Sequence, residues 1–289
     1  MSSVPANLKG SPAVASRRVM LPWGRWGLRL TAFLYLGFMV ALPLATIIRN
    51  GFADGFTAFW ADITNPTAFS ALKLTLMTSV LITVINAVMG TLTAYVLVRF
   101  HFPAKGLFNA LIDMPFAIPT LVTGVMLVAL YGPQRAVGGW LNAHDIKVIF
   151  ATPGIVLALL VITYPFVIRA VQPVLMEIEK GQEEAAYTIG ASKWTTFRKV
   201  VLPTITPALL TGGLLCFARA LGEFGSVVVV AGNIPGVTLT APVYVFGQIE
   251  SQNQRGASAM SILLLALSFT LILTVEWMQN RNGKSNVSS

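Results

Sequence analysis

The chain has 289 residues, of which 55% are apolar and 11% are charged, and its formal net charge is +9. This composition excludes an ordinary soluble domain and predicts an integral membrane protein with helical spans. The basic residues are scattered between apolar runs, which argues against nucleic-acid binding, and a single cysteine, Cys216, excludes an internal disulfide and a cysteine metal cluster.

Taken in chain order, the sequence predicts a tail over residues 1–27, a transmembrane domain over residues 28–275 and a second tail over residues 276–289. Six apolar runs in the transmembrane domain are long enough to cross a bilayer. They lie at about residues 30–48, 74–98, 107–131, 154–175, 205–230 and 257–275. The predicted fold class is therefore all-α, a polytopic membrane protein with about six transmembrane helices.

The third and fourth predicted spans contain both prolines and charges. Asp113, Pro115 and Pro119 lie in the third, and Pro165 and Arg169 lie in the fourth. Two prolines and an acid in one span predict a bent or broken helix, which is tolerated only against protein or a water-filled cavity. We expect the Arg169 side chain to reach the nearby membrane surface and Asp113 to have a structural role beside the prolines.

The fifth predicted span carries Arg219 and Glu223, which are four residues apart and would share one face of a helix. A charge in the bilayer costs about 3 kcal/mol on insertion scales, so both residues should face the interior of the bundle and pair. The pair is either a gating or polarising group on an anion path or a structural link to a neighbouring span. If it is a simple pair, exchanging the two charges should restore the folding that single variants lose.

The distribution of lysine and arginine predicts the orientation. With the N-terminus inside, thirteen basic residues fall on inner segments and five on outer ones. Positive residues favour the cytoplasmic side, so both tails and the polar segment at residues 176–203 are expected in the cytoplasm.

That polar segment, residues 176–203, is predicted to form two short helices joined at Gly190, because glycine enters left-handed backbone conformations at little cost. Ser192 is expected to cap the second helix, and Pro203 to stop it or begin the next element. Such a helix pair cannot be buried in lipid. It is either a docking element at the membrane surface or a solvated amphipathic loop.

Within this segment, Glu184-Ala185-Ala186 is followed after three residues by Gly190 and after nine more by Val200-x-Leu202-Pro203. This spacing resembles the EAA motif of ABC importer permeases, with Val200 in the place of an isoleucine. In that family the loop is the coupling helix, which sits in a groove of a separate ATPase subunit. The resemblance implies a type I permease fold in which Glu184 anchors the coupling helix and Gly190 sets its bend. The implied coupling residues are Glu184, Ala185, Ala186, Gly190, Leu202 and Pro203.

Further runs are similar to sulfate/thiosulfate permeases of the CysT type. They are the run at residues 220–226 with that at residues 230–233, and the runs that begin at Asp113, Asp145 and Arg169. The resemblance implies a permease subunit of an ATP-driven importer, which translocates sulfate or thiosulfate delivered by a periplasmic binding protein. Candidate residues of the translocation path are Asp113, Arg169, Arg219 and Glu223.

The same resemblance implies an inner-membrane assembly with two ATPase subunits, a second permease subunit of the W type and the periplasmic binding protein. ATP and Mg would be bound by the ATPase subunits, and no cofactor is expected in this chain. Gly283-Lys284-Ser285 ends like a phosphate-binding loop but lacks the earlier glycine. His101 and His144 fall in loops on opposite sides of the membrane, so no catalytic or metal site is expected and the chain is not expected to be an enzyme.

Two alternatives remain open from the residues. A molybdate or tungstate ABC permease would share the oxyanion motif. A secondary anion transporter would use Arg219 and Glu223 as an ion-coupled site and would need no ATPase, but it leaves the pattern at residues 183–203 unexplained.

Overall fold

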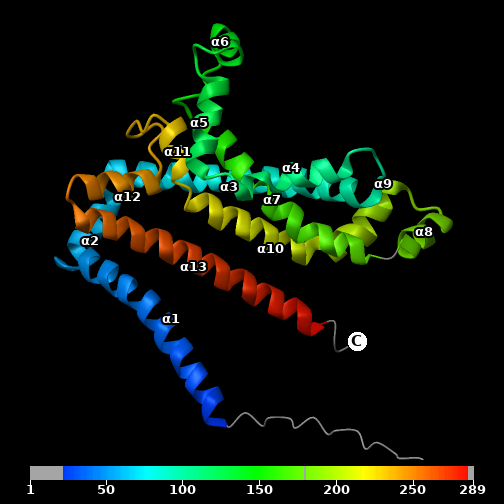
Figure 1. Ribbon diagram of the computed structural model, residues 1–289, viewed down its shortest axis with the longest axis horizontal. Helices are drawn as coiled ribbons and strands as arrows, with labels where there is room; N and C mark the ends of the chain where they lie inside the picture. The colour runs from blue at the N-terminus through cyan, green and yellow to red at the C-terminus, as the bar shows by residue number, and fades with distance from the viewer. Residues whose placement is uncertain (1–21, 179, 286–289) are drawn as a thin grey trace, which may run out of the picture. The chain divides into compact units, whose positions relative to one another are not determined.

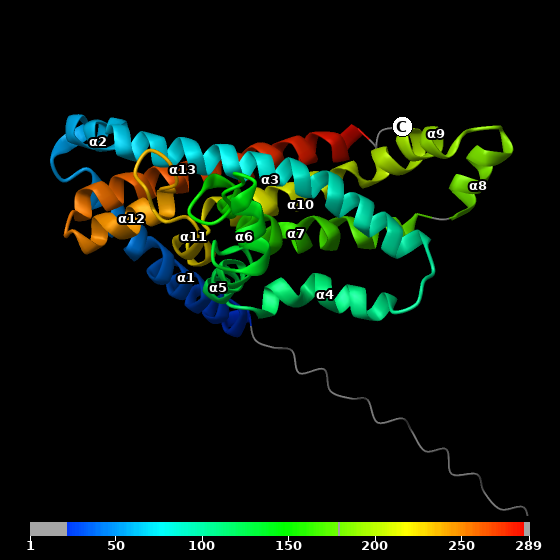
Figure 2. The same cartoon turned by 90° about the horizontal axis from the view of Figure 1, so that it is seen from above.

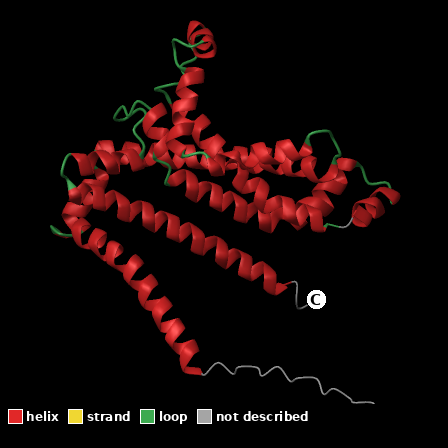
Figure 3. Cartoon of the chain, viewed as in Figure 1, coloured by secondary structure: helices red, strands yellow, loops and turns green. Residues whose placement is uncertain are grey.

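The computed structural model describes residues 22–178 and 180–285 of the chain. The described residues form helices joined by loops and contain no strand, which confirms the all-α prediction (Figures 1 and 3). Most of the predicted N-terminal tail and the last four residues lie outside the described residues.

The chain divides at Thr46 into two units. The first contains most of α1 (Pro22–Gly51), a helix long and apolar enough to cross a membrane. The second, from Ile47 onwards, contains the other helices. Its spans are α3 (Pro66–Arg99), α7 (Thr152–Glu177), α10 (Leu202–Leu221) and α13 (Gln254–Ser285). Shorter helices join or extend them: α2 (Gly55–Thr64), α6 (Ala136–Ala143) and α12 (Ala241–Glu250).

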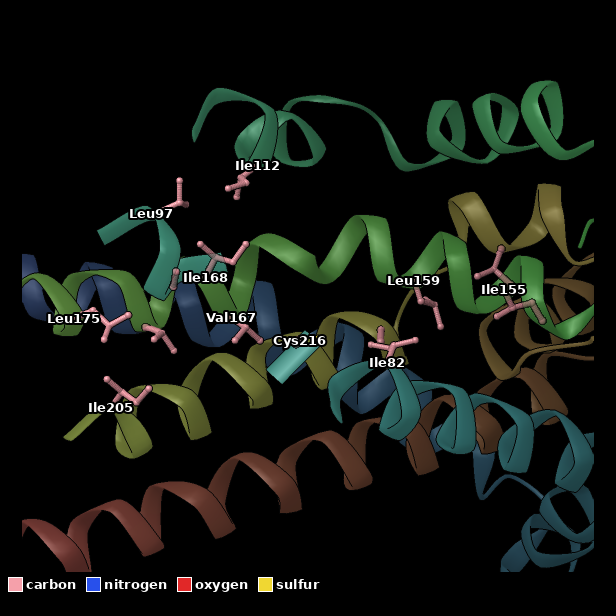
Figure 4. Packing of buried hydrophobic residues seen from close by; sticks show 14 of the residues in the cluster. Ile82, Leu97, Ile112, Ile155, Leu159, Val167, Ile168, Leu175, Ile205 and Cys216 are labelled. Atoms are coloured by element: carbon pink, nitrogen blue, oxygen red, sulfur yellow. The ribbon is translucent and has the colours of Figure 1, made fainter. Parts of the chain in front are cut away.

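The centre of the second unit is α7, which packs against both α3 and α10 (Figure 2). Its side chains Val167 and Ile168 are fully buried and belong to the same core cluster as Ile82 of α3 and Ile205 of α10 (Figure 4). Lipid is as apolar as these side chains, so the spans associate through close packing rather than through hydrophobic exclusion from water. Gly90 of α3 and Gly212 of α10 permit this approach, because both face Val167 of α7.

The third predicted span is broken, as the prolines indicated. It consists of α4 (Lys105–Ala117) and α5 (Thr120–Tyr131), which meet at an angle of 112°. The break falls at Ile118, which takes the extended conformation favoured before a proline. With this bent pair counted as one span, the described residues provide up to six candidate spans, in agreement with the prediction of about six.

The prediction of one continuous fifth span was wrong. α10 ends at Leu221, and a separate helix, α11 (Gly225–Val230), follows three residues later. Glu223 lies in this break, where its Oε1 accepts hydrogen bonds from the Ser226 amide at 2.8 Å and the Ser226 hydroxyl at 2.9 Å. The Glu223 carboxylate thus accepts the hydrogen bond of the Ser226 amide, which in a continuous helix would be donated to a backbone carbonyl of the preceding turn. α11 packs on α5, so the two broken spans meet.

Replacing Gly212 by alanine should destabilise the bundle, because the new methyl carbon would lie 2.8 Å from Ala170 Cβ and 3.0 Å from Val167 Cα. We expect a loss of about 1–3 kcal/mol, as in other overpacked cores, and a lower melting temperature of the detergent-purified protein. Gly213→Ala is the matched control, since its methyl group would meet only Thr83 Cγ2 at 3.7 Å. Equal melting temperatures of the two variants would contradict the close contact between α10 and α7.

Exchanging the charges of Arg219 and Glu223 should not restore stability, although a simple ion pair would allow it. Arginine at position 223 cannot accept the hydrogen bond of the Ser226 amide, and a buried amide without an acceptor costs about 1–3 kcal/mol. Glu223→Gln retains an acceptor oxygen and should therefore melt at a higher temperature than the double variant Arg219→Glu/Glu223→Arg. A double variant as stable as the native protein would refute the capping role.

Candidate functional site

The polar segment forms two helices joined by a tight turn, as predicted. α8 (Lys180–Thr188) is followed by Gly190 with a left-handed φ of 83°, and then by α9 (Lys193–Thr196). The Ser192 side chain caps α9 by accepting a hydrogen bond from the Thr195 amide at 3.2 Å. α8 is a separate helix that begins at Lys180, whereas the sequence suggested a helical run from Met176.

Pro203 does not stop the second helix. α9 passes into one π-helical turn, η1 (Phe197–Val201), and then directly into α10, where Pro203 occupies the first turn. Proline lacks an amide proton and its ring clashes with the carbonyl four residues earlier. The wider π turn accommodates that conflict, so α9 stays continuous with a membrane span. Residues 193–221 therefore form one unbroken helical stretch from α9 through η1 to α10.

The tip of the segment exposes apolar side chains. Ile189 is 86% exposed and Trp194 is 69% exposed. An exposed apolar surface beside charged residues is typical of a protein-binding site rather than of a solvated loop. Among the motif residues, Glu184, Ala185, Gly190 and Pro203 are exposed, Ala186 is partly buried, and Leu202 packs against the main core.

Arg99 and Glu183 form an ion pair that the sequence did not indicate. Arg99 is the last residue of α3 and Glu183 lies in the first turn of α8, and their side chains are only 11% and 10% exposed. Arg99 Nη2 also donates to the carbonyl of Ile178 at 3.4 Å. No local pattern connects residues so far apart in the chain.

Arg169 binds an acidic partner, Asp113, that the sequence had not paired with it. Its guanidinium binds Asp113 of α4 through two hydrogen bonds of 2.7 Å, from Nε to Oδ1 and from Nη2 to Oδ2. It also donates to Gln172 Oε1 at 2.6 Å and to the Asn109 carbonyl at 3.1 Å. A two-pronged contact with a carboxylate matches the planar guanidinium and neutralises its charge, so the Asp113 carboxylate holds Arg169 against α4.

Arg219 and Glu223 pair as predicted, with 2.6 Å between Nη1 and Oε2. The environments of the two differ, because the Glu223 side chain is 1% exposed and that of Arg219 is 32% exposed. Among the described residues, no hydrogen bond or ion pair joins this pair to Asp113 and Arg169. The four candidate path residues therefore form two separate pairs: Arg169 and Asp113 link α7 to α4, and Arg219 and Glu223 link the end of α10 to the break that follows it.

A groove of about 940 Å³ lies between α3, α4 and α7. Its lining is largely apolar, with Asn86, Thr93 and Tyr164 as the polar side chains. Such a lining does not suit a dianion, which needs hydrogen-bond donors or positive charge. No group of three or more potential metal ligands occurs in the described part of the chain.

A further cluster links α2 to the start of α13. Arg255 pairs with Asp62, with 2.8 Å between Nε and Oδ2, and also with Asp54. Burial, and secondarily the Asp62 carboxylate, raise the pKa of Tyr244 in α12 above its usual value.

Residues 86–284 match the model of the family described as "Binding-protein-dependent transport system inner membrane component". The chain is 40% identical to the sulfate transport system permease protein CysT of Escherichia coli K12, over 94% of this chain and 98% of that protein. It is 39% identical to a probable sulfate transport system permease protein of Nephroselmis olivacea, over 95% and 96% of the two chains.

Solved structures show the same fold. A bacterial ABC transporter involved in the import of the acidic polysaccharide alginate matches 90% of this chain and 96% of its own, with a TM-score of 0.76 and 16% identity. The MetNI methionine ABC transporter matches 73% of this chain and 95% of its own, with a TM-score of 0.52 and 18% identity. The chain therefore belongs to the family of binding-protein-dependent transport system inner membrane components and is a multi-pass inner-membrane transporter subunit.

Proposed function

We propose that the chain is the membrane-spanning subunit of an ATP-driven importer of sulfate or thiosulfate. The observation that carries this proposal is its similarity, at about 40% identity over nearly the whole length, to proteins named sulfate transport permeases. The exposed helix pair at residues 180–196 supports an ATP-driven mechanism, because a secondary transporter would have no use for such a docking surface. The relatives' names favour sulfate over molybdate.

The proposed assembly contains two ATPase subunits, a second permease subunit of the W type and a periplasmic sulfate/thiosulfate-binding protein. The family description supports a binding-protein-dependent system. A solved alginate transporter of the same fold is described in complex with its substrate-bound periplasmic protein. ATP and Mg belong to the ATPase subunits in this proposal. The excess of lysine and arginine on the predicted inner segments supports a cytoplasmic location for both tails and α8.

The proposed mechanism is alternating access driven through α8 and α9. ATP binding closes the two ATPase subunits, and α8 follows the surface on which it is docked. Glu184 and Ala185 are exposed on α8 and form the contact, while Gly190 sets the angle between α8 and α9. Because α9 is continuous with α10, its displacement reorients the fifth span.

The translocation path is proposed to pass the Arg169 and Arg219 pairs. Asp113 is 50% exposed within this single chain, and a carboxylate facing lipid would be costly. The Asp113 side of α4 should therefore face water or the second permease subunit. Each arginine is already neutralised by a carboxylate. A passing dianion would therefore find hydrogen-bond donors on the guanidinium groups but no unpaired positive charge that would bind it tightly. Weak binding of this kind permits release as well as entry.

Glu184→Lys should uncouple transport while the protein still reaches the membrane. Reversing a charge at a protein interface costs about 2 kcal/mol or more, so binding to the ATPase and sulfate uptake should each fall about tenfold or more. Gln182→Lys is the matched control, because it adds the same charge about 200° away around α8. Co-purification of the ATPase and uptake by membrane vesicles are the measurements. Normal uptake by Glu184→Lys would refute the coupling role.

Vesicles that contain the whole assembly should take up radiolabelled sulfate only when ATP is supplied. Excess thiosulfate should compete strongly and excess molybdate weakly, since the relatives are named sulfate permeases. Uptake without the ATPase subunits would point instead to a secondary transporter. Stronger competition by molybdate than by thiosulfate would replace sulfate with molybdate as the substrate.

A further inference from the structure

The two helices of the coupling segment, residues 176–203, are attached to the membrane spans in different ways. The second helix, α9, continues into α10, but α8 has no such continuity with α10. Residues 181–188 make one ion pair with a membrane span among the described residues, and it is the pair of Glu183 with Arg99. Among the described residues this ion pair is therefore the charged link between α8 and α3, and Tyr95 of α3 also lies near Glu183 and Tyr187 of α8.

The end of α3 also contacts the second half of the segment. The Tyr95 ring lies edge-on to Phe197 of η1, with 5.7 Å between the ring centroids. Phe197 in turn stacks on the exposed Trp194 of α9 at 5.9 Å. Within one turn of helix, α3 thus carries an ion pair to α8 and an aromatic contact to η1. The last turn of α3 is a junction on which both halves of the coupling segment converge.

The Arg99–Glu183 pair is not arranged for stability alone. Both side chains are about nine-tenths buried, and Arg99 Nε has no hydrogen-bond partner. Removing a guanidinium from water while leaving one of its donors unsatisfied costs free energy. Proteins in which apolar residues of similar size replace a buried ion pair are often at least as stable as the original. A buried ion pair instead imposes one specific geometry, because each charge loses its only compensation if the other moves away.

We propose that the Arg99–Glu183 ion pair holds α8 to α3 so that the two helices move as one body during the ATP cycle. Arg99 and Glu183 are then positioning residues for energy coupling, distinct from the exposed surface that contacts the ATPase. This inference rests on the proposed docking function of α8. It adds a second route of transmission, through α3, to the one that passes through α9 and α10.

The first test measures sulfate uptake per ATP hydrolysed in proteoliposomes that contain the complete transporter. Arg99→Gln and Glu183→Gln should each lower this ratio about threefold or more, the size of effect seen for residues that carry coupling between sites. ATP hydrolysis and ATPase co-purification should persist. The charge-swapped variant Arg99→Glu/Glu183→Arg should recover most of the ratio. Glu177→Gln is the control, because Glu177 is an exposed carboxylate at the end of α7 that forms no ion pair among the described residues.

The second test needs no substrate. Spin labels replace Gln182 on α8 and the exposed Phe69 at the far end of α3, and buried Cys216 is retained. In the otherwise native transporter, the distance between the labels should be the same without nucleotide and with ATP trapped. In Arg99→Gln it should change or broaden between the two states, and the charge swap should reverse this.

The outcomes separate the two proposals. An unchanged label distance in Arg99→Gln, or a loss of uptake and ATP hydrolysis in equal proportion, would overturn the role of the ion pair. A native assembly that hydrolyses ATP but takes up no sulfate would overturn the proposed substrate alone, and the label distances would still decide on the ion pair. If Arg99→Gln fails to reach the membrane, failure of the charge swap to restore it would also count against the proposal.

Discussion

Backbone hydrogen bonding in the bilayer is the constraint on which this structure depends. Lipid offers neither donors nor acceptors, so a span must be helical, and a break is tolerated only where protein covers it. Two spans are nevertheless broken, between α4 and α5 and between α10 and α11. Proline at position 119 has no amide proton to satisfy, and Glu223 provides an acceptor for the Ser226 amide. The two broken spans then pack on each other through α5 and α11.

The central helix α7 connects the helices beside these breaks to the other spans of the bundle. α7 contacts α3 and α10 along its length and also reaches α4, α5 and α11. Small residues such as Gly90 and Gly212 bring the neighbouring backbones close, which replaces the hydrophobic driving force that is absent in lipid. α7 thus contacts both broken spans and the neighbouring spans α3 and α10 among the described residues.

Three arginines of the described spans each have an acidic partner. Arg169 binds Asp113, Arg219 binds Glu223, and Arg99 binds Glu183. Pairing removes most of the cost of placing an arginine in or near lipid. It also links elements of the chain, since Arg169 connects α7 to α4 and Arg99 connects α3 to α8. The same interactions that make the charges tolerable therefore position the moving parts.

The sequence by itself determined the features that depend on local chemistry. Apolar run lengths predicted the number of spans because the thickness of a bilayer sets the length of a helix. Gly190 and Ser192 predicted the turn and the cap because backbone conformation and capping involve neighbouring residues. The prolines at 115 and 119 likewise predicted a broken third span.

The tertiary structure decided which charges meet. Arg169 seemed close enough to the membrane surface to reach it, yet its partner Asp113 lies on a different helix. The break at Glu223 was not evident, because an apolar run with two glycines is compatible with a continuous helix until the packing of α11 on α5 is known. The Arg99–Glu183 pair joins residues far apart in the chain, and the energy of such a contact depends on burial and geometry that no local pattern records.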